Sequence, residues 1–162
     1  MLTRLSESNY RKTEEEEEIE KRKTSIIIHG VTESQDQSTD NRIMEDNVQI
    51  EELLHKLDLD RVSVNKAIRL GKRPDSSDAK PRPLKVTLAS EEQKIDVLKK
   101  AKNYLRRKEG ENGVFIHQDL TPNQRKRRQD LVKELKRRQS QGEQNLMIAN
   151  WKIVERRRQV EH

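Results

Sequence analysis

The side chains best suited to chemistry in this sequence are the lysines and arginines near its C-terminus. Residues 121–162 contain 12 Lys and Arg against 5 Asp and Glu, a net charge of +7, whereas residues 1–120 contain 23 against 24. Concentrated cations indicate a segment that binds a polyanion, because they displace counterions from phosphates. The alternative interpretation is a solvated helix surface. The cations expected to contact nucleic acid here are Arg125, Lys126, Arg127, Arg128, Lys133 and Arg137.

Residue patterns for catalysis or metal binding are missing from the sequence. The chain has no cysteine, and its histidines at positions 29, 55, 117 and 162 have no metal-ligand spacing. It also has no glycine-rich phosphate loop, nucleophile elbow or carboxylate cluster. We therefore expect neither an enzyme nor a cofactor, and we assign no catalytic, cofactor-binding or metal-binding residue.

Targeting and membrane signals are also missing. No stretch reaches the roughly 18 consecutive apolar residues of a membrane-spanning helix, and the N-terminus lacks the apolar part of a signal peptide. The pattern predicts an intracellular protein without a membrane partner. The run Arg125-Lys126-Arg127-Arg128 is compatible with nuclear import, although such a run arises easily in a nucleic-acid-binding helix. Both a cytoplasmic ribonucleoprotein and the nucleus stay open as locations.

The core must be confined to a few patterned segments, because only 30% of the residues are apolar and 40% are charged. β-Branched or alternating runs predict strands at 25–31, 62–70, 84–88 and 114–117. Helical spacing predicts helices at 41–57 and 91–107, the second starting at a Ser90 capping box. This order indicates an α+β fold, a ferredoxin-like βαββαβ antiparallel sheet with both helices on one face.

The open face of this sheet is the second expected contact surface, because unstacked bases can stack and hydrogen-bond on such a platform. By alternation, it would consist of Ile27, His29, Ala67, Arg69, Lys85, Thr87, Phe115 and His117. The residues expected to contact phosphate in this domain are Arg69, Lys85 and, in the loop after the second strand, Lys72 and Arg73. The residues expected to stack under bases are Phe115 and, more weakly, His29 and His117. The alternative is that Phe115 only covers the sheet or packs under the C-terminal helix.

The C-terminal segment has the clearest helix start in the chain. Thr121 precedes Pro122 and Gln124, which gives a capping box with proline at the first helical position, and Gly142 is the matching stop. The cations that share one side of this helix by spacing are Lys126, Lys133 and Arg137. Two short apolar runs then flank Ala149-Asn150, which predicts a two-residue hairpin turn. Trp151 is expected to cover the helix, and the alternative is an anchor for a partner protein.

These elements divide the chain into four parts. Residues 1–24 are expected to form a disordered or loosely helical charged arm, because an acidic run at 14–18 has too few apolar neighbours for a heptad seam. The folded parts are then 25–120 and a small basic domain at 121–155, and 156–162 is a basic tail. Leu2 and Leu5 are compatible with the end of a coiled coil, so self-association stays open.

Four strings occur in a suggestive order: SIIIHGV at 25–31, IRLGKR at 68–73, RPLKV at 82–86 and VFIHQDLT at 114–121. Together they resemble the RNA-binding protein encoded by the first open reading frame of LINE-type non-LTR retrotransposons, over about residues 22–155. The resemblance implies an RNA-recognition-motif fold at 25–120 and a small C-terminal domain, both of which bind RNA. It also implies a nucleic-acid chaperone that coats its own transcript, usually as a trimer joined by an upstream coiled coil.

The sequence departs from this family's pattern in two ways. Residues 1–24 are too short and too polar for the coiled coil, which leaves homo-oligomerisation open. Where ordinary RNA-recognition motifs place paired aromatics, this chain has Ile27 and Lys85, which weakens base stacking. The family's pattern puts RNA contact on Arg69 and Lys85 of the sheet and on Arg125, Arg127 and Arg128 of the last helix.

The sequence therefore predicts sequence-tolerant binding of single-stranded RNA, dominated by charge, with single-stranded DNA as the alternative ligand. We expect the cations of the last helix and the open sheet face to form one continuous track. The rival hypothesis is a protein-interaction adaptor that docks a partner on the sheet face or the Trp151 hairpin. A third alternative is a nonfunctional, truncated copy of an element.

Overall fold

The chain forms two compact units, unit 1 (Met1–Asp119) and unit 2 (Leu120–His162). The computed structural model describes residues 13–76, 79–107 and 113–157. The sequence places the boundary between the domains after residue 120, and the contacts divide the chain after Asp119. Each unit is described separately below.

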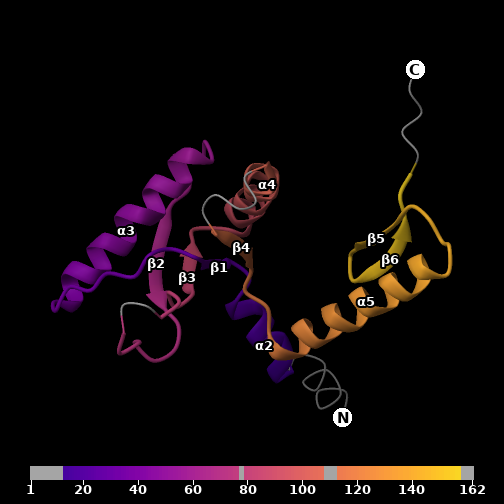
Figure 1. The fold of residues 1–162 in the computed structure, drawn as a ribbon, viewed down its shortest axis with the longest axis horizontal. Coiled ribbons are helices and arrows are strands. Elements are labelled where there is room, and N and C mark those ends of the chain that lie inside the picture. Colours follow the sequence, from indigo (N-terminus) through magenta and orange to yellow (C-terminus); the bar gives the residue numbers. More distant parts are fainter. Residues whose placement is uncertain (1–12, 77–78, 108–112, 158–162) are drawn as a thin grey trace, which may run out of the picture. The chain divides into compact units, whose positions relative to one another are not determined.

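Unit 1 is built on a four-stranded antiparallel sheet with the strand order β2-β3-β1-β4 (Figure 1). The strands are β1 (Ser25–His29), β2 (Val64–Arg69), β3 (Leu84–Leu88) and β4 (Phe115–Gln118). Two long helices connect them, α3 (Thr39–Lys56) after β1 and α4 (Glu91–Arg107) after β3. The expected α+β class and the four-stranded antiparallel sheet are confirmed.

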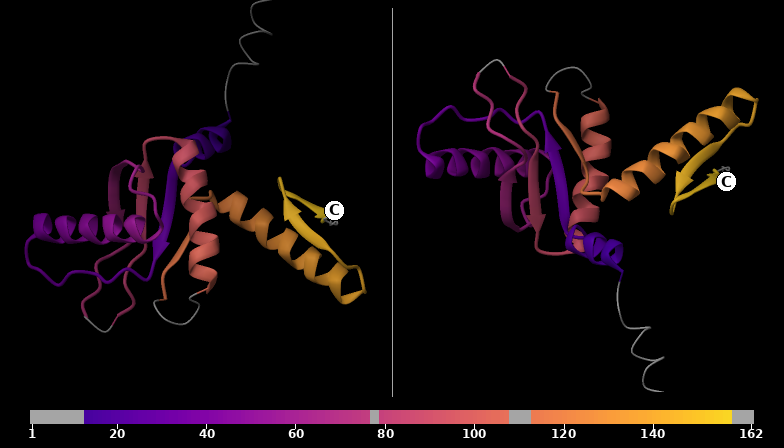
Figure 2. Two further views of the ribbon diagram at one scale, coloured as in Figure 1. Left: turned by 90° about the horizontal axis from the view of Figure 1, so that it is seen from above. Right: turned by 90° about the horizontal axis from the view of Figure 1, so that it is seen from below.

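One face of the sheet carries the core of unit 1. Ile26 of β1 lies opposite Val86 of β3, and both are at most 1% exposed. Ile50 of α3 and Val97 of α4 belong to the same buried cluster, so both helices cover this face. α3 contacts β2, whereas α4 contacts β4 and β3 (Figures 1 and 2). Each large aliphatic side chain buried here stabilises the unit by about 1.5–3 kcal/mol.

The helix starts in unit 1 use short polar side chains. Ser38 caps α3, which begins at Thr39, two residues before the expected start. The Ser90 hydroxyl accepts a hydrogen bond from the backbone N–H of Gln93 (3.2 Å), as expected for a cap. The Gln93 side chain does not complete the box, because its Oε1 accepts from the backbone N–H of Ser63 (3.0 Å). Gln93 therefore ties the start of α4 to the segment that leads into β2.

Residues 14–21 form a helix, within the part of the chain that we expected to be a disordered or loosely helical arm. α2 (Glu14–Lys21) starts with a complete capping box, in which the Thr13 hydroxyl accepts from the N–H of Glu16 and the Glu16 carboxylate accepts from the N–H of Thr13, both at 3.2 Å. Four glutamates lie in its first turn, where the helix dipole favours negative charge. Leu2 and Leu5 lie outside the described residues.

Gly30 lets β1 end next to the start of β4. Its φ is +87°, and a Cβ built there would lie 2.1 Å from the carbonyl oxygen of Gly113. Only glycine accommodates both the left-handed backbone and this close approach. The His-Gly step after the isoleucine run is thus a packing requirement of the β1–β4 pair.

Unit 2 consists of a helix and a hairpin (Figure 1). α5 (Pro122–Ser140) starts with the expected capping box of Thr121 and Gln124, and β5 (Leu146–Ala149) pairs with β6 (Lys152–Glu155). Both strands contact α5. The expected turn at Ala149-Asn150 is wrong by one residue: the turn is Asn150-Trp151, with φ of +50° and +60°. This turn needs positive φ at both central positions, which asparagine tolerates better than alanine.

Candidate nucleic-acid interface

The sheet of unit 1 has a second face, opposite the core, that carries most of the residues expected to bind nucleic acid on this sheet. The ladder places Ile27 of β1 between Lys85 of β3 and His117 of β4, on the face opposite the core. The expected residues that the register places on this face are Ile27, His29, Lys85, Thr87, Phe115 and His117. Phe115 is 60% exposed there.

Two expected residues lie on the other face, and the reason is a register shift in β2. Ala67 pairs with Val86 and Arg69 with Leu84, both of which point into the core. The ladder has an irregularity between Val64 and Lys66, and one extra residue reverses the alternation beyond it. The prediction that Ala67 and Arg69 lie on the open face is therefore wrong, and Lys66 and Ile68 take their place.

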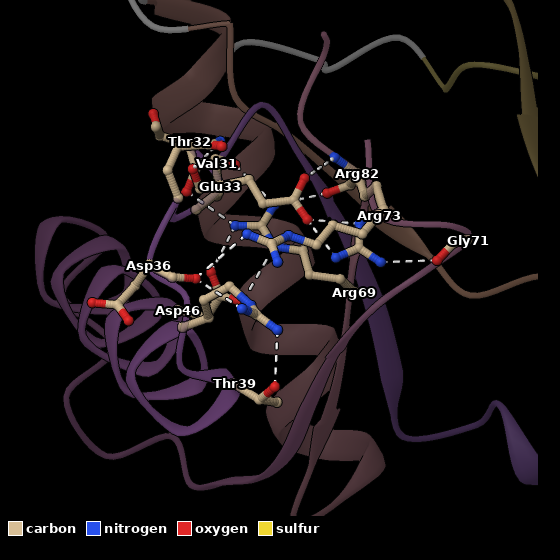
Figure 3. A network of polar contacts seen from close by, with 12 residues as sticks. Val31, Thr32, Glu33, Asp36, Thr39, Asp46, Arg69, Gly71, Arg73 and Arg82 are labelled. Atoms are coloured by element: carbon tan, nitrogen blue, oxygen red, sulfur yellow. Dashed lines mark hydrogen bonds and ion pairs between the residues drawn. The ribbon is translucent and has the colours of Figure 1, made fainter. Parts of the chain in front are cut away.

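Arg69 is the centre of a polar network at one end of the sheet (Figure 3). Its side chain is only 6% exposed. Nε and Nη2 donate to the two carboxylate oxygens of Asp46 on α3, at 3.2 and 2.7 Å. The other donors reach the backbone carbonyls of Val31 (2.9 Å), Arg82 (2.7 Å) and Thr32 (3.0 Å). All five N–H groups of this guanidinium are used within unit 1, so none remains for a phosphate.

Some basic residues of the loop between β2 and β3 also have hydrogen-bond partners within unit 1 (Figure 3). Arg82 donates through Nε to Glu33 (2.6 Å) and through Nη1 to the carbonyl of Gly71 (2.8 Å). Burial of Glu33 acts to raise its pKa, but the hydrogen bonds from Arg82 outweigh it and the pKa is lowered. Among the described residues, Arg73 makes one hydrogen bond, a long one to the carbonyl of Asp36 (3.4 Å). Lys72 is exposed and forms no ion pair with any described residue.

Three rings lie together on the open face where β1 meets β4. The His29 and His117 rings stack with centroids 4.8 Å apart, and their Nε2 atoms are 2.7 Å apart. His117 Nδ1 lies 2.9 Å from the carbonyl oxygen of Gln118, which assigns its proton to Nδ1 and leaves Nε2 to accept from His29. Phe115 lies opposite His29 in the ladder. The cluster offers an aromatic surface at the edge of the sheet.

Acidification is expected to destabilise unit 1 through His29. Burial, and then the charge of His117, lower the pKa of His29 below its ordinary value of 6.5. The unfolded chain therefore binds the proton more readily than the folded chain. The stabilisation from this group is present above pH 6.5 and is lost as the pH falls through that value towards the folded pKa.

Urea unfolding between about pH 8 and pH 5 measures this loss, and the His29→Gln variant should decline less steeply than the wild type. His55 acts in the opposite direction in both chains, because its hydrogen bond to the Asp60 carboxylate raises its pKa. The difference between the two chains therefore isolates His29. An equally steep decline in His29→Gln would rule out this explanation.

Lys85 already has a counterion on the open face. Its Nζ lies 3.2 Å from Oδ2 of Asp119, and the other oxygen of that carboxylate lies 3.4 Å from Nε of Arg22. The Asp119 side chain is 10% exposed, and Oδ2 has no hydrogen bond from any described residue. The sequence interpretation missed Asp119, although it directly follows β4 and its N–H reaches the carbonyl of Ser25. A phosphate that contacts Lys85 must compete with this carboxylate.

The cations of α5 have fewer internal partners than those of the sheet. Arg137 pairs with Glu134 and donates to Gln141, and Arg138 pairs with Glu143 (2.8 Å). Five others are exposed and make no side-chain ion pair or hydrogen bond with any described residue. These five, here called the free cations of α5, are Arg125, Lys126, Arg128, Lys133 and Lys136. The sequence interpretation had included Arg137 instead of Lys136.

Arg127 contacts the hairpin. Its Cζ lies 5.3 Å from the centroid of the Trp151 ring, within the range of a cation–π interaction. The side chain is otherwise exposed, and no hydrogen bond or ion pair joins it to the described part of the chain. Trp151 therefore contacts α5, the helix that we expected it to cover.

Within residues 13–76, 79–107 and 113–157, no group of three His, Asp or Glu side chains is placed to hold a metal ion. None of the helices described is both long and apolar enough to cross a membrane. Comparison of the sequence with models of protein families and with curated proteins finds no match.

Proposed function

We propose that this protein binds single-stranded nucleic acid, RNA in the first place, through the cations of α5. One observation carries the proposal: the five free cations of α5 lie exposed on one helix, and none of them has a counterion among the described residues. An exposed cation without a partner gains most from a phosphate, because no existing ion pair has to be broken. Arg127, next to them, adds a sixth cation.

Single strands are favoured over duplexes by the ring cluster of unit 1. The 60% exposed Phe115 and the His29–His117 pair suit the faces of unpaired bases, which a duplex keeps stacked. Aromatic residues are few and the cations of the sheet are mostly paired, so we expect little sequence preference. A continuous track that joins the α5 cations to this face stays a prediction.

We also propose a specific fold for unit 1 and a family for the chain. The βαββαβ order and the strand order β2-β3-β1-β4 support a ferredoxin-like, RNA-recognition-motif-like fold for unit 1. With the four sequence strings, this supports a role as a non-catalytic RNA-binding protein of a LINE-type retrotransposon ribonucleoprotein, acting as a nucleic-acid chaperone. Fold alone does not imply such a role, so the binding site has to be tested directly.

Binding of a fluorescently labelled single-stranded oligonucleotide is expected to weaken steeply with salt. If about six cations contact phosphates, the logarithm of the association constant should fall against log salt with a slope of about −4. Fluorescence anisotropy between about 50 and 200 mM salt measures this slope on RNA and DNA of several sequences. Equal affinity at both salt concentrations would contradict the phosphate-dominated mechanism.

A second candidate function is protein docking, favoured by apolar side chains on α3. Ile43, Met44 and Val48 are 47%, 64% and 52% exposed. Exposed apolar side chains on one helix are typical of interaction surfaces. A protein that ignores oligonucleotides at low salt but binds a defined protein partner would favour this function.

A further inference from the structure

Trp151 occupies a backbone position that favours a different residue. It is the second central residue of the β5–β6 turn, where Asn150 and Trp151 have φ of +50° and +60°. Two-residue turns of this kind strongly prefer Asn-Gly, because glycine alone takes positive φ without a steric cost. A bulky aromatic residue with positive φ is an outlier. Such local strain often marks positions that are held for function.

The turn brings the Trp151 ring to the guanidinium of Arg127. The Arg127 Cζ lies over the indole ring, 5.3 Å from the ring centroid. None of the Arg127 side-chain N–H donors bonds to a described residue. A guanidinium that is held against a ring and keeps its N–H donors available suits bidentate binding of a phosphate.

We propose that Trp151 is a positioning residue that holds Arg127 as a fork for a backbone phosphate of single-stranded nucleic acid. This inference rests on the proposed function and assigns one specific contact within it. A free arginine loses rotamer freedom when it binds, whereas a stacked one has already lost part of that freedom. Arg127 should therefore bind phosphate more tightly than an unstacked arginine of α5, such as Arg128.

A double-mutant cycle between Trp151 and Arg127 tests the inference. Trp151→Gly removes the ring but creates Asn-Gly, the preferred sequence for this turn, so the hairpin is expected to persist. Arg127→Lys keeps the charge and removes the fork, and Arg128→Lys is the matched exchange without a ring. Affinity for a labelled single-stranded oligonucleotide is measured by anisotropy at low salt, with circular dichroism to verify folding.

We expect Trp151→Gly and Arg127→Lys each to weaken binding by about two- to fivefold, and Arg128→Lys by a smaller factor. In the Arg127→Lys background, Trp151→Gly should have little further effect, because the ring then has no fork to position. Trp151→Phe should restore most of the affinity that Trp151→Gly loses.

Independent effects of the two substitutions, or equal losses for Arg127→Lys and Arg128→Lys, would overturn the inference while leaving the proposed function intact. A wild-type chain that binds no oligonucleotide at low salt would overturn both. The cycle is repeated with inorganic polyphosphate as a competitor that carries no bases. Coupling with polyphosphate supports the phosphate fork, whereas coupling seen only with the oligonucleotide would mean that a base stacks on Trp151 instead.

Discussion

Replacing Lys126, Lys133 and Lys136 together by glutamine is expected to lower the affinity for single-stranded RNA by roughly 10²- to 10³-fold at 50 mM salt. Each lost phosphate contact reduces the steepness of log affinity against log salt by about 0.7, so the slope should become shallower, from about −4 to about −2. Glutamine keeps a helix propensity close to that of lysine, so α5 should persist. Anisotropy titrations over a range of salt concentrations measure both quantities.

The matched control removes three lysines from α4. Lys99, Lys100 and Lys102 are exposed, and their replacement by glutamine changes the net charge by the same amount. This control should lose much less affinity, because the proposed contacts depend on α5 and not on net charge. If both triple variants bind equally weakly, the affinity reflects overall charge and α5 is not the interface. The affinities of the wild type and of the α5 triple variant should also converge at high salt, where counterion release contributes little.

Replacing Arg69 by methionine is expected to lower the free energy of unfolding of unit 1 by about 3–5 kcal/mol. The substitution leaves the Asp46 carboxylate, whose side chain is 13% exposed, without its cation. It also removes the donors to the carbonyls of Val31, Thr32 and Arg82. Buried polar groups that lose their partners carry the full cost of desolvation. Urea unfolding followed by circular dichroism measures the change.

Two further variants make the Arg69 prediction specific. Arg61→Met removes an exposed arginine that has no partner among the described residues and should change the stability by at most about 0.5 kcal/mol. Adding Asp46→Leu to Arg69→Met should recover part of the loss, because no buried carboxylate is then left unpaired. If Arg69→Met lowers the free energy of unfolding no more than Arg61→Met does, the polar network around Arg69 does not stabilise unit 1. Arg69→Lys should bind oligonucleotide like the wild type, because Arg69 lies on the core face of the sheet.

The strands whose alternation is regular could be predicted from the sequence in detail. Leu84, Val86 and Leu88 of β3 point into the core, as their spacing of two predicts. β2 could not be predicted in the same way, because its pattern hides the irregularity after Val64. A single inserted residue reverses which side chains face the helices, and no local feature of the sequence marks it.

The sequence also contains the capping residues of two helices, but they led to a precise prediction for only one of them. Thr121 and Gln124 led to the correct start of α5, and Thr13 and Glu16 follow the same pattern. The second pair adjoins an acidic run, for which the sequence interpretation left both a disordered and a loosely helical arm open. Because glutamates near a helix N-terminus interact favourably with the helix dipole, the run supports α2.

The candidate interface could be predicted as a set of residue types but not as a set of available side chains. Arg69 and Lys85 look alike in the sequence to the free cations of α5. They differ because Asp46 and Asp119, far away in sequence, lie within 2.7 and 3.2 Å of them. Such pairings depend on the tertiary structure, so sequence alone overestimates the cations that a ligand can reach on the sheet.

The junction at Asp119 also bears on how unit 1 could be used as a module. The Asp119 N–H bonds to the carbonyl of Ser25, and its carboxylate lies beside Arg22, so the chain enters and leaves the four-stranded sheet at the same place. Domains whose ends adjoin can be inserted into a host loop or circularly permuted with only a short linker. The part of unit 1 from Arg22 to Asp119 therefore has the geometry of a portable domain.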